Sequence, residues 1–232
     1  MAELLIDPGH GGKDPGGTSK FGREEDFNLK ISLYQYDRFK QLGVPVAITR
    51  NNDVDLGEEA RVAAVKNSGA KYCISNHLNI GGGDRAEVIH SLYDDGKLAN
   101  AIKEQLFAAG QNAVKVYFRK NSSGSDYYYM HRRTGAVKVN IVEYAFLDNE
   151  ADFNHFNANW KAYAEAVVKA YCLFTGRAYK PVEQPKPAPA PKLAPTVDIY
   201  RVQVGAFRDK KNAERLAAEL KAIGYDAFIK TI

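Results

Sequence analysis

The segment from Leu4 to Gly12 reads Leu-Leu-Ile-Asp-Pro-Gly-His-Gly-Gly, an apolar run that stops at a histidine held between glycines. Such a run indicates a strand buried on both faces, which is typical of a parallel sheet covered by helices. Ligands of open α/β sheets bind beyond the carboxyl ends of the strands, and His10 is predicted to lie at such an end. The alternative interpretation is a glycine-rich turn that carries a surface histidine.

Short apolar stretches alternate with segments of helical periodicity over the rest of residues 4–174. After the opening run, the patterns predict strands at 45–49, 71–77, 86–93, 113–118 and 137–146 and helices beginning near 24, 57, 97 and 160. Strands that alternate with helices predict an α/β fold. We therefore expect a mostly parallel sheet of about six strands flanked by helices.

The composition is that of an ordinary globular protein, with 45% hydrophobic and 26% charged residues among 232. The net charge is +4, but lysines and arginines are interspersed with acids, which argues against a nucleic-acid partner. No segment is predicted to span a membrane, and the amino terminus carries no export leader, so we expect the protein to stay in the cytoplasm unless something releases it. Cys73 and Cys172 match no metal-binding or redox spacing and are expected to be reduced core residues.

The composition changes at Lys180, where a stretch rich in proline, alanine and lysine begins. This stretch, 180–197, is predicted to be an extended linker, because proline-rich segments cannot bury a core. It separates a unit at 1–179 from a β-α-β unit at 198–232. The second unit is below the size that usually folds alone, so we expect it to pair with a second copy or to be part of a larger module.

Four polar residues are expected where such a sheet presents ligands. His10 follows the first strand, Glu24 begins the first helix and His77 ends the third strand, and two imidazoles with one carboxylate suit zinc. Glu143 interrupts an otherwise apolar strand, where burial of a carboxylate is costly unless it serves a metal site or acts as a general base. A salt bridge to an arginine is the alternative for Glu143. The other histidines are expected to be a core residue at His90 and exposed residues at 131 and 155.

Four blocks of the sequence resemble the signature of zinc-dependent N-acetylmuramoyl-L-alanine amidases of the Amidase_3 type. They are Asp-Pro-Gly-His-Gly-Gly at 7–12, Glu-Glu-Asp-Phe-Asn-Leu at 24–29, Ser-Asn-His-Leu-Asn at 75–79 and Val-Glu-Tyr-Ala-Phe-Leu-Asp-Asn at 142–149. The resemblance covers roughly residues 3–175, with the blocks in the family's order.

The resemblance implies roles for individual residues. His10, Glu24 and His77 would bind one Zn²⁺, and Glu143 would be the catalytic carboxylate. Glu24 is favoured over Glu25 because the family ligand is the first acid of its block. The sequence departs from the family at Asn76, where an apolar residue usually precedes the second histidine, but alternation along a strand points its side chain away from His77.

Residues near the carboxyl terminus resemble one repeat of the SPOR-type peptidoglycan-binding module. The residues that carry this resemblance are Tyr-Arg-Val-Gln-Val-Gly-Ala-Phe, Asn-Ala-Glu-Arg-Leu and Gly-Tyr-Asp-Ala. A complete module contains two such halves, and the resemblance implies peptidoglycan as a partner. One hypothesis is a homodimer in which two chains complete a module by pairing their half-repeats, and the alternative is a truncated or disordered tail.

The combined resemblance implies hydrolysis of the amide between the lactyl group of N-acetylmuramic acid and L-alanine of the stem peptide. The chain would then act as an endolysin or autolysin, released from the cytoplasm by lysis or by a holin-type failure of the membrane. Two alternatives stay open: a zinc peptidase that cuts within the stem peptide, and a catalytically inactive wall-binding protein. Tyr127, Tyr128 and Tyr129 are expected either to flank the substrate groove or to be half-buried packing residues.

Overall fold

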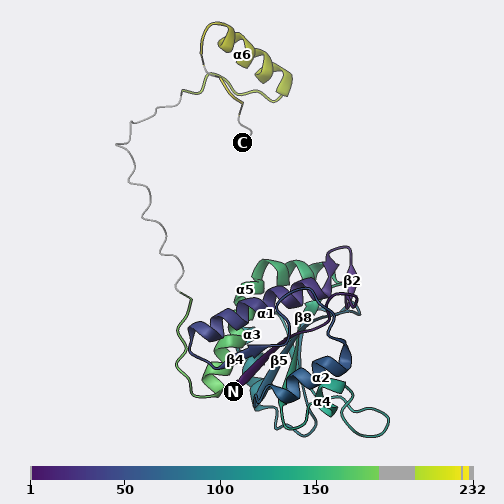
Figure 1. The fold of residues 1–232 in the computed structure, drawn as a ribbon. Helices are drawn as coiled ribbons and strands as arrows, with labels where there is room; N and C mark the ends of the chain where they lie inside the picture. Colours follow the sequence, from purple (N-terminus) through teal and green to yellow (C-terminus); the bar gives the residue numbers. More distant parts are fainter. Residues whose placement is uncertain (1, 183–201, 226, 230–232) are drawn as a thin grey trace. The chain divides into compact units, whose positions relative to one another are not determined.

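The computed structural model describes residues 2–182, 202–225 and 227–229 (Figure 1). The chain forms two compact units, Met1–Pro181 and Val182–Ile232. The expected linker, 180–197, lies largely outside the described residues. Each unit is therefore described by itself.

A six-stranded sheet forms the centre of the first unit, in the order β4-β1-β5-β8-β6-β7. All neighbouring strands run parallel except β6 and β8, which are antiparallel. The mostly parallel sheet expected from the sequence is confirmed. The strands are β1 (Leu4–Pro8), β4 (Val46–Ile48), β5 (Tyr72–Asn79), β6 (Ala86–His90), β7 (Val114–Tyr117) and β8 (Lys138–Phe146), and a separate two-stranded hairpin contains β2 (Thr18–Ser19) and β3 (Gly22–Arg23).

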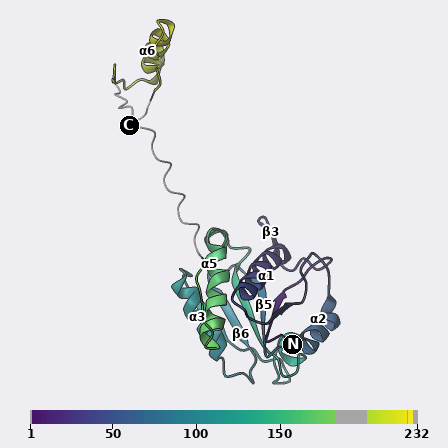
Figure 2. The same ribbon diagram turned by 60° about the vertical axis from the view of Figure 1, so that its left-hand side comes forward.

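Helices cover both faces of the sheet (Figures 1 and 2). One face packs against α1, α3 and α5 through the larger buried cluster, in which Ile31, Ile102 and Val167 are fully buried. The other face packs against α2 and α4 through a smaller cluster that includes Val65 and Met130. The helices are α1 (Glu24–Gln41), α2 (Gly57–Asn67), α3 (Lys97–Ala108), α4 (Tyr129–Arg132) and α5 (Glu150–Phe174).

Two details differ from the sequence-based expectation. Helix α5 begins ten residues earlier than expected, because the Asn149 side chain accepts hydrogen bonds from the backbone of Ala151 and Asp152 and caps the helix. His131 is buried, with 8% of its surface exposed, instead of lying on the surface. His131 lies in the short helix α4, and its ring packs in a T-shaped arrangement with the Tyr128 ring. Cys73 and Cys172 are buried free thiols, as expected.

The second unit contains helix α6 (Lys210–Ala222), capped by Asp209. The helix of the expected β-α-β arrangement is present. The expected strands at 200–204 and 225–230 fall partly outside the described residues, and their described parts are not assigned as strands. None of the described residues at 202–225 and 227–229 is buried, so this part of the unit has no buried apolar core of its own.

Among the described residues, no helix has both the length and the apolar character that crossing a membrane requires. The longest helix, α5, interleaves charged and polar residues with its buried face.

Candidate functional site

A cleft of about 750 Å³ opens at the carboxyl ends of β1, β5 and β8. The position agrees with the expectation for an open α/β sheet. His10, Glu24, His77 and Glu143 all line it, so the structure brings the four candidate site residues together.

Three of these side chains converge on one point. His10, Glu24 and His77 each offer a ligand atom, and the three atoms lie within 4.8 Å of one another. Glu24 Oε1 lies 2.8 Å from His77 Nδ1 and 3.3 Å from His10 Nε2. Glu25 instead faces Arg23, with 2.7 Å between its Oε1 and the guanidinium, so Glu24 is the acid that joins the histidines.

His10 adopts a backbone conformation that non-glycine residues rarely populate, with φ at +59°. Two buried arginines hold the loop in this shape. Arg61 donates to the carbonyl of His10 at 2.8 Å, and Arg50 donates to the carbonyl of Gly9 at 2.9 Å. A strained conformation that its surroundings over-determine in this way is typical of functional sites.

Glycines around the site make room for the ligand side chains. A Cβ on Gly9 would lie 2.6 Å from His77 Nδ1 and still nearer to Cε1 and Nε2 of the same ring. A Cβ on Gly16 would lie 2.6 Å from both Glu24 Oε2 and His10 Cδ2. Both glycines therefore allow the backbone to approach the imidazoles and the carboxylate at distances that a side chain would block.

Hydrogen bonds keep Glu24 ionised despite its burial. Burial alone would raise the pKa of this carboxyl, but hydrogen bonds to His10 and His77 outweigh that effect and lower the pKa well below its usual range. Gly17 N donates to Oε2 at 2.8 Å, and the Asn28 amide donates to Oε1 at 3.1 Å. A buried negative charge is thus held in place between two imidazoles.

His10 has a carboxylate on each side of its ring. Its Nδ1 lies 2.8 Å from Asp14 Oδ2, which leaves Nε2 directed at the shared point beside Glu24. Burial lowers the pKa of His10, whereas Glu24 and Asp14 raise it, with a net value of about 9. A histidine oriented by a carboxylate on its other nitrogen is the usual arrangement around a bound metal. Two imidazole nitrogens and one ionised carboxylate are a donor set that suits zinc, so His10, His77 and Glu24 fit a divalent zinc ion.

Glu143 lies beside the histidines on the central strand β8, in register with His77 on β5. Burial raises the pKa of its carboxyl to about 7. Among the described residues, its Oε2 is buried without a hydrogen-bond partner. Glu87 lies opposite on β6, but Arg85 and Tyr117 bind that carboxylate at 2.7 and 2.8 Å. Glu143 therefore has an unpaired buried carboxylate oxygen at the cleft, and no arginine among the described residues forms the salt bridge considered from the sequence.

Sequence reasoning missed the residues that support this site. Asp7 is fully buried and binds Arg61 at 2.6 Å, and it also accepts hydrogen bonds from Thr49 and Ser75 at 2.7 Å. Asp7 could have been identified from the sequence, because it is an acid within the apolar run at 4–8. The cost of burying a carboxylate in an apolar strand had already identified Glu143. Asp14 offered no comparable signal, because a carboxylate in a polar loop is ordinary.

Two of the three consecutive tyrosines combine the two expected roles. Tyr128 and Tyr129 line the cleft and also pack against the smaller buried cluster. Tyr127 is exposed, and the Arg119 guanidinium lies 3.8 Å above the centre of its ring.

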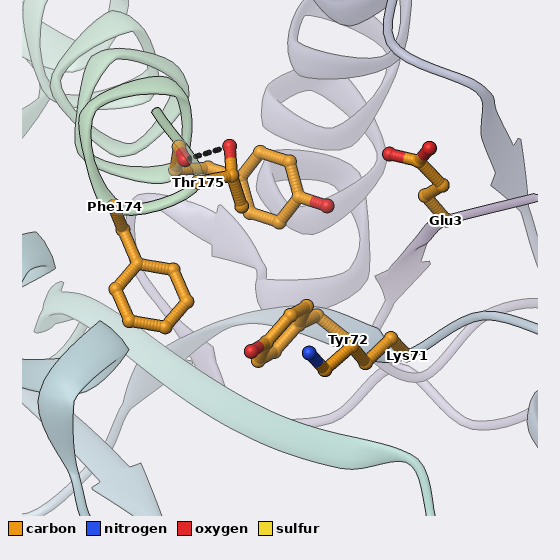
Figure 3. A pocket seen from close by; sticks show the side chains of 6 residues that line it. Glu3, Lys71, Tyr72, Phe174 and Thr175 are labelled. Carbon is orange, nitrogen blue, oxygen red and sulfur yellow. Dashed lines mark hydrogen bonds between the residues drawn. The ribbon is translucent and has the colours of Figure 1, made fainter. Parts of the chain in front are cut away.

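A second hollow of about 300 Å³ lies at the opposite end of the sheet, where β5 begins and α5 ends (Figure 3). Aromatic rings of Tyr72, Tyr171 and Phe174 form much of its wall. Its one carboxylate, on Glu3, is paired with Arg177. The donor set of the cleft is not repeated there.

Residues 196–232 match the SPOR domain family. Over 99% of its length, the chain is 26% identical to the sporulation-specific N-acetylmuramoyl-L-alanine amidase of Bacillus subtilis, covering 84% of that protein. It is 28% identical to the N-acetylmuramoyl-L-alanine amidase CwlM of Bacillus licheniformis, again over 99% of this chain and over 85% of CwlM.

The fold has counterparts among solved structures. The catalytic domain of CwlV, an N-acetylmuramoyl-L-alanine amidase from Bacillus (Paenibacillus) polymyxa, superposes with a TM-score of 0.67 at 22% identity, covering 77% of this chain and 100% of that domain. Cwp6 from Clostridium difficile also has a TM-score of 0.67, at 24% identity, over 74% of this chain and 28% of Cwp6. Residues 4–173, most of the 232, match the Amidase_3 family, described as N-acetylmuramoyl-L-alanine amidase. The chain therefore belongs to this amidase family.

Proposed function

We propose that this chain is a zinc-dependent amidase that hydrolyses the bond between the lactyl group of N-acetylmuramic acid and L-alanine of the peptidoglycan stem. In this proposal His10, Glu24 and His77 hold one Zn²⁺, and Glu143 is the catalytic carboxylate. The observation that carries it is the convergence of three ligand atoms within 4.8 Å beside a buried carboxylate whose Oε2 has no partner among the described residues.

A zinc ion held there would supply Lewis-acid chemistry for the amide carbonyl and for water. Glu143 would take the proton of the attacking water and return it to the departing amine. Burial supports both steps, because it raises the pKa of Glu143 to about 7, where a carboxyl both accepts and donates protons near neutral pH.

The cleft offers room and suitable walls for a peptide. Its volume of about 750 Å³ falls in the range of small-molecule sites. Tyr128, Tyr129 and Ile80 line it and present aromatic and apolar surface, while Asp14 and Glu58 add charge. We propose that the stem peptide lies across these walls with its first amide above the ligand group.

The test measures amine release from purified cell walls by the full chain, with and without a chelator. The parent is expected to release amino groups, to lose activity on chelation and to regain it with zinc. Glu143→Gln is expected to bind zinc but to release no amines. The matched control is Glu150→Gln, because the Glu150 side chain is 64% exposed at the start of α5 and should leave activity unchanged. Zinc binding without turnover by the parent would favour the inactive wall-binding alternative.

Product analysis decides which amide is cut. The proposed reaction leaves a free lactyl carboxylate on muramic acid and a new amino terminus on L-alanine. A new amino terminus on any later residue of the stem would instead establish the zinc peptidase.

We propose that the chain is organised as a catalytic domain at 1–179, a linker at 180–197 and a peptidoglycan-binding half-repeat at 198–232. The half-repeat would pair with that of a second chain, giving a homodimer. Exposed apolar side chains in its described residues support pairing, since Val202, Val204 and Ile223 are 81%, 61% and 70% exposed. Light scattering of the full chain is expected to give twice the monomer mass, and Ile223→Asp to give the monomer. A monomeric parent at micromolar concentration would refute the homodimer.

We further propose that the enzyme acts as an endolysin or autolysin that reaches the wall after the membrane fails. In cells that make this chain, activity is expected in the soluble fraction until the membrane is permeabilised, and cell lysis should follow only then. Activity in the medium of intact cells would contradict this proposal.

A further inference from the structure

A closed ring of hydrogen bonds lies beneath the cleft, on the face of the sheet that packs against α1 and α5. The Asn76 amide nitrogen donates to Gln35 Oε1 at 2.8 Å, the Gln35 amide nitrogen donates to the Tyr144 hydroxyl at 2.7 Å, and this hydroxyl donates to Asn76 Oδ1 at 2.8 Å. All three side chains are fully buried. We call these three residues the hydrogen-bond ring.

The ring connects three elements that each carry one of the proposed site residues: α1 carries Glu24, β5 carries His77 and β8 carries Glu143. Gln35 is on α1, which begins at Glu24. Asn76 directly precedes His77 on β5, and Tyr144 directly follows Glu143 on β8. Because successive strand residues point to opposite faces, the ring lies on one face while His77 and Glu143 point to the other.

Both amide nitrogens of the ring donate a second hydrogen bond. The Asn76 nitrogen donates a second hydrogen bond to Ser32 Oγ at 2.8 Å, and the Gln35 nitrogen donates a second one to the carbonyl of Ala164 at 3.3 Å. Buried amides without partners are costly, so any shift of α1 along the sheet would break several bonds at once. Apolar contacts are not directional and would permit small shifts. The ring therefore fixes the position of α1 along β5 and β8.

We propose that Asn76, Gln35 and Tyr144 are positioning residues for the metal-binding and catalytic side chains. Glu24 lies three helical turns before Gln35, so a displacement of α1 moves the carboxylate against His77 and Glu143. A displacement near 1 Å at a reacting group costs about a hundredfold in rate, which makes partial loosening of the ring measurable. This inference rests on the proposed function for its kinetic readout, but its metal-binding readout does not require turnover.

The test compares two substitutions of the same kind in the same core. Tyr144→Phe removes the hydroxyl that closes the ring. Tyr163→Phe is the matched control, since Tyr163 is fully buried on α5 and its hydroxyl is without a hydrogen-bond partner among the described residues. Both variants are studied as full chains well below their melting temperatures, with circular dichroism to confirm folding.

The readouts are the zinc dissociation constant by chelator competition, the visible spectrum of the cobalt-loaded protein, and kcat and KM at saturating zinc. Tyr144→Phe is expected to raise the zinc dissociation constant about tenfold, to alter the cobalt spectrum and to lower kcat about tenfold with KM changed less than twofold. Tyr163→Phe is expected to match the parent in all of them.

Equal zinc affinity and an unchanged cobalt spectrum in Tyr144→Phe would overturn the inference, as would equal losses in the two variants. If Tyr144→Phe does not fold, Ser32→Ala replaces it, because it removes one bond to Asn76 and should weaken zinc binding about threefold. Unchanged affinity in a folded Ser32→Ala would then count as refutation. A parent without amidase activity refutes the proposed function alone, since the metal-binding comparison still decides the role of the ring.

Discussion

The buried pair of Asp7 and Arg61 provides a direct test of how this fold holds the loop that carries His10. Asp7 is fully buried, and 5% of the Arg61 surface is exposed. Arg61 Nη1 lies 2.6 Å from Asp7 Oδ1, and the guanidinium also donates to the carbonyls of Pro8 and His10 at 2.6 and 2.8 Å. Asp7→Asn preserves the shape of the side chain but removes the charge that compensates the buried guanidinium.

Breaking a buried pair by removing one partner costs about 3–5 kcal/mol. Each kcal/mol lowers the melting temperature of a domain of this size by about 2–4 °C, so the variant should melt about 6–20 °C below the parent. Asp7→Asn is therefore expected to lose a large part of the free energy of unfolding, which is typically about 5–15 kcal/mol.

Urea unfolding followed by circular dichroism, in the presence of a chelator, measures this loss without a contribution from bound metal. Lys20→Met is the control, since it removes an ion pair to Glu150 in which both side chains are more than 60% exposed, at 65% and 64%. Such pairs add little, so no measurable change is expected. A loss below about 1 kcal/mol in Asp7→Asn would refute the reasoning, because it would mean that Arg61 finds compensation elsewhere.

Three further changes test other parts of the site and core. Asp14→Asn should weaken zinc binding about 10–100-fold, because it removes the carboxylate that orients His10, and chelator competition measures the loss. Gly9→Ala should abolish zinc binding, because the new Cβ would lie within 2.6 Å of His77 Nδ1 and displace the ring, and metal analysis after dialysis measures it. Burial lowers the pKa of His131 from 6.5 to about 4. As the pH falls, the unfolded chain therefore becomes protonated at this histidine before the folded chain does. The free energy of unfolding should therefore fall by about 3 kcal/mol between pH 6.5 and pH 4 through this residue, and urea titrations of the parent and of His131→Phe measure the difference.

Each of these three expectations has a result that would contradict it. Asp26→Asn, at an exposed acid on α1, should leave zinc affinity unchanged, so equal effects at both acids would exclude a specific role for Asp14. Zinc bound at parental affinity by Gly9→Ala would show that His77 has room to move. Parallel pH profiles for the parent and His131→Phe would show that His131 is not the group that titrates.

The sheet and the candidate ligands could be predicted because their signals are local. The apolar run at 4–8 and the β-branched run around Glu143 identify buried strands by composition alone. His10 follows from where the first strand stops and His77 from its place near the carboxyl end of β5, since parallel strands present their carboxyl ends at one edge of the sheet.

The supporting contacts could not be predicted, because they depend on register between distant segments. Gln35 and Tyr144 are 109 residues apart, and Arg61 lies 54 residues from Asp7. A single-residue slip of β1 or β8 would place Asp7 or Tyr144 on the opposite face of its strand. The burial of His131 was missed for a different reason: a four-residue helix in a polar loop has too few positions to show a periodic pattern.

The start of α5 could have been predicted from its capping residues, but the apolar spacing along the helix gave a later start. Asn149 and the acids at 150 and 152 form a typical amino-terminal cap with a negatively charged first turn. The following polar residues dilute the apolar spacing, although Phe153 and Phe156 are almost completely buried, at 5% and 1% exposure.

The position of β8 in the sheet has a consequence for local motion. β8 is hydrogen-bonded on both sides, to β5 and to β6, whereas β4 and β7 form the edges. Backbone amides around Glu143 should therefore exchange with deuterium only through global unfolding, while those of the edge strands and of the loop at 9–17 exchange through smaller openings. The carboxylate and His77, on the doubly paired strands β8 and β5, would remain fixed as the loop that carries His10 fluctuates, so adjustment to the size of a bound ion would fall to His10.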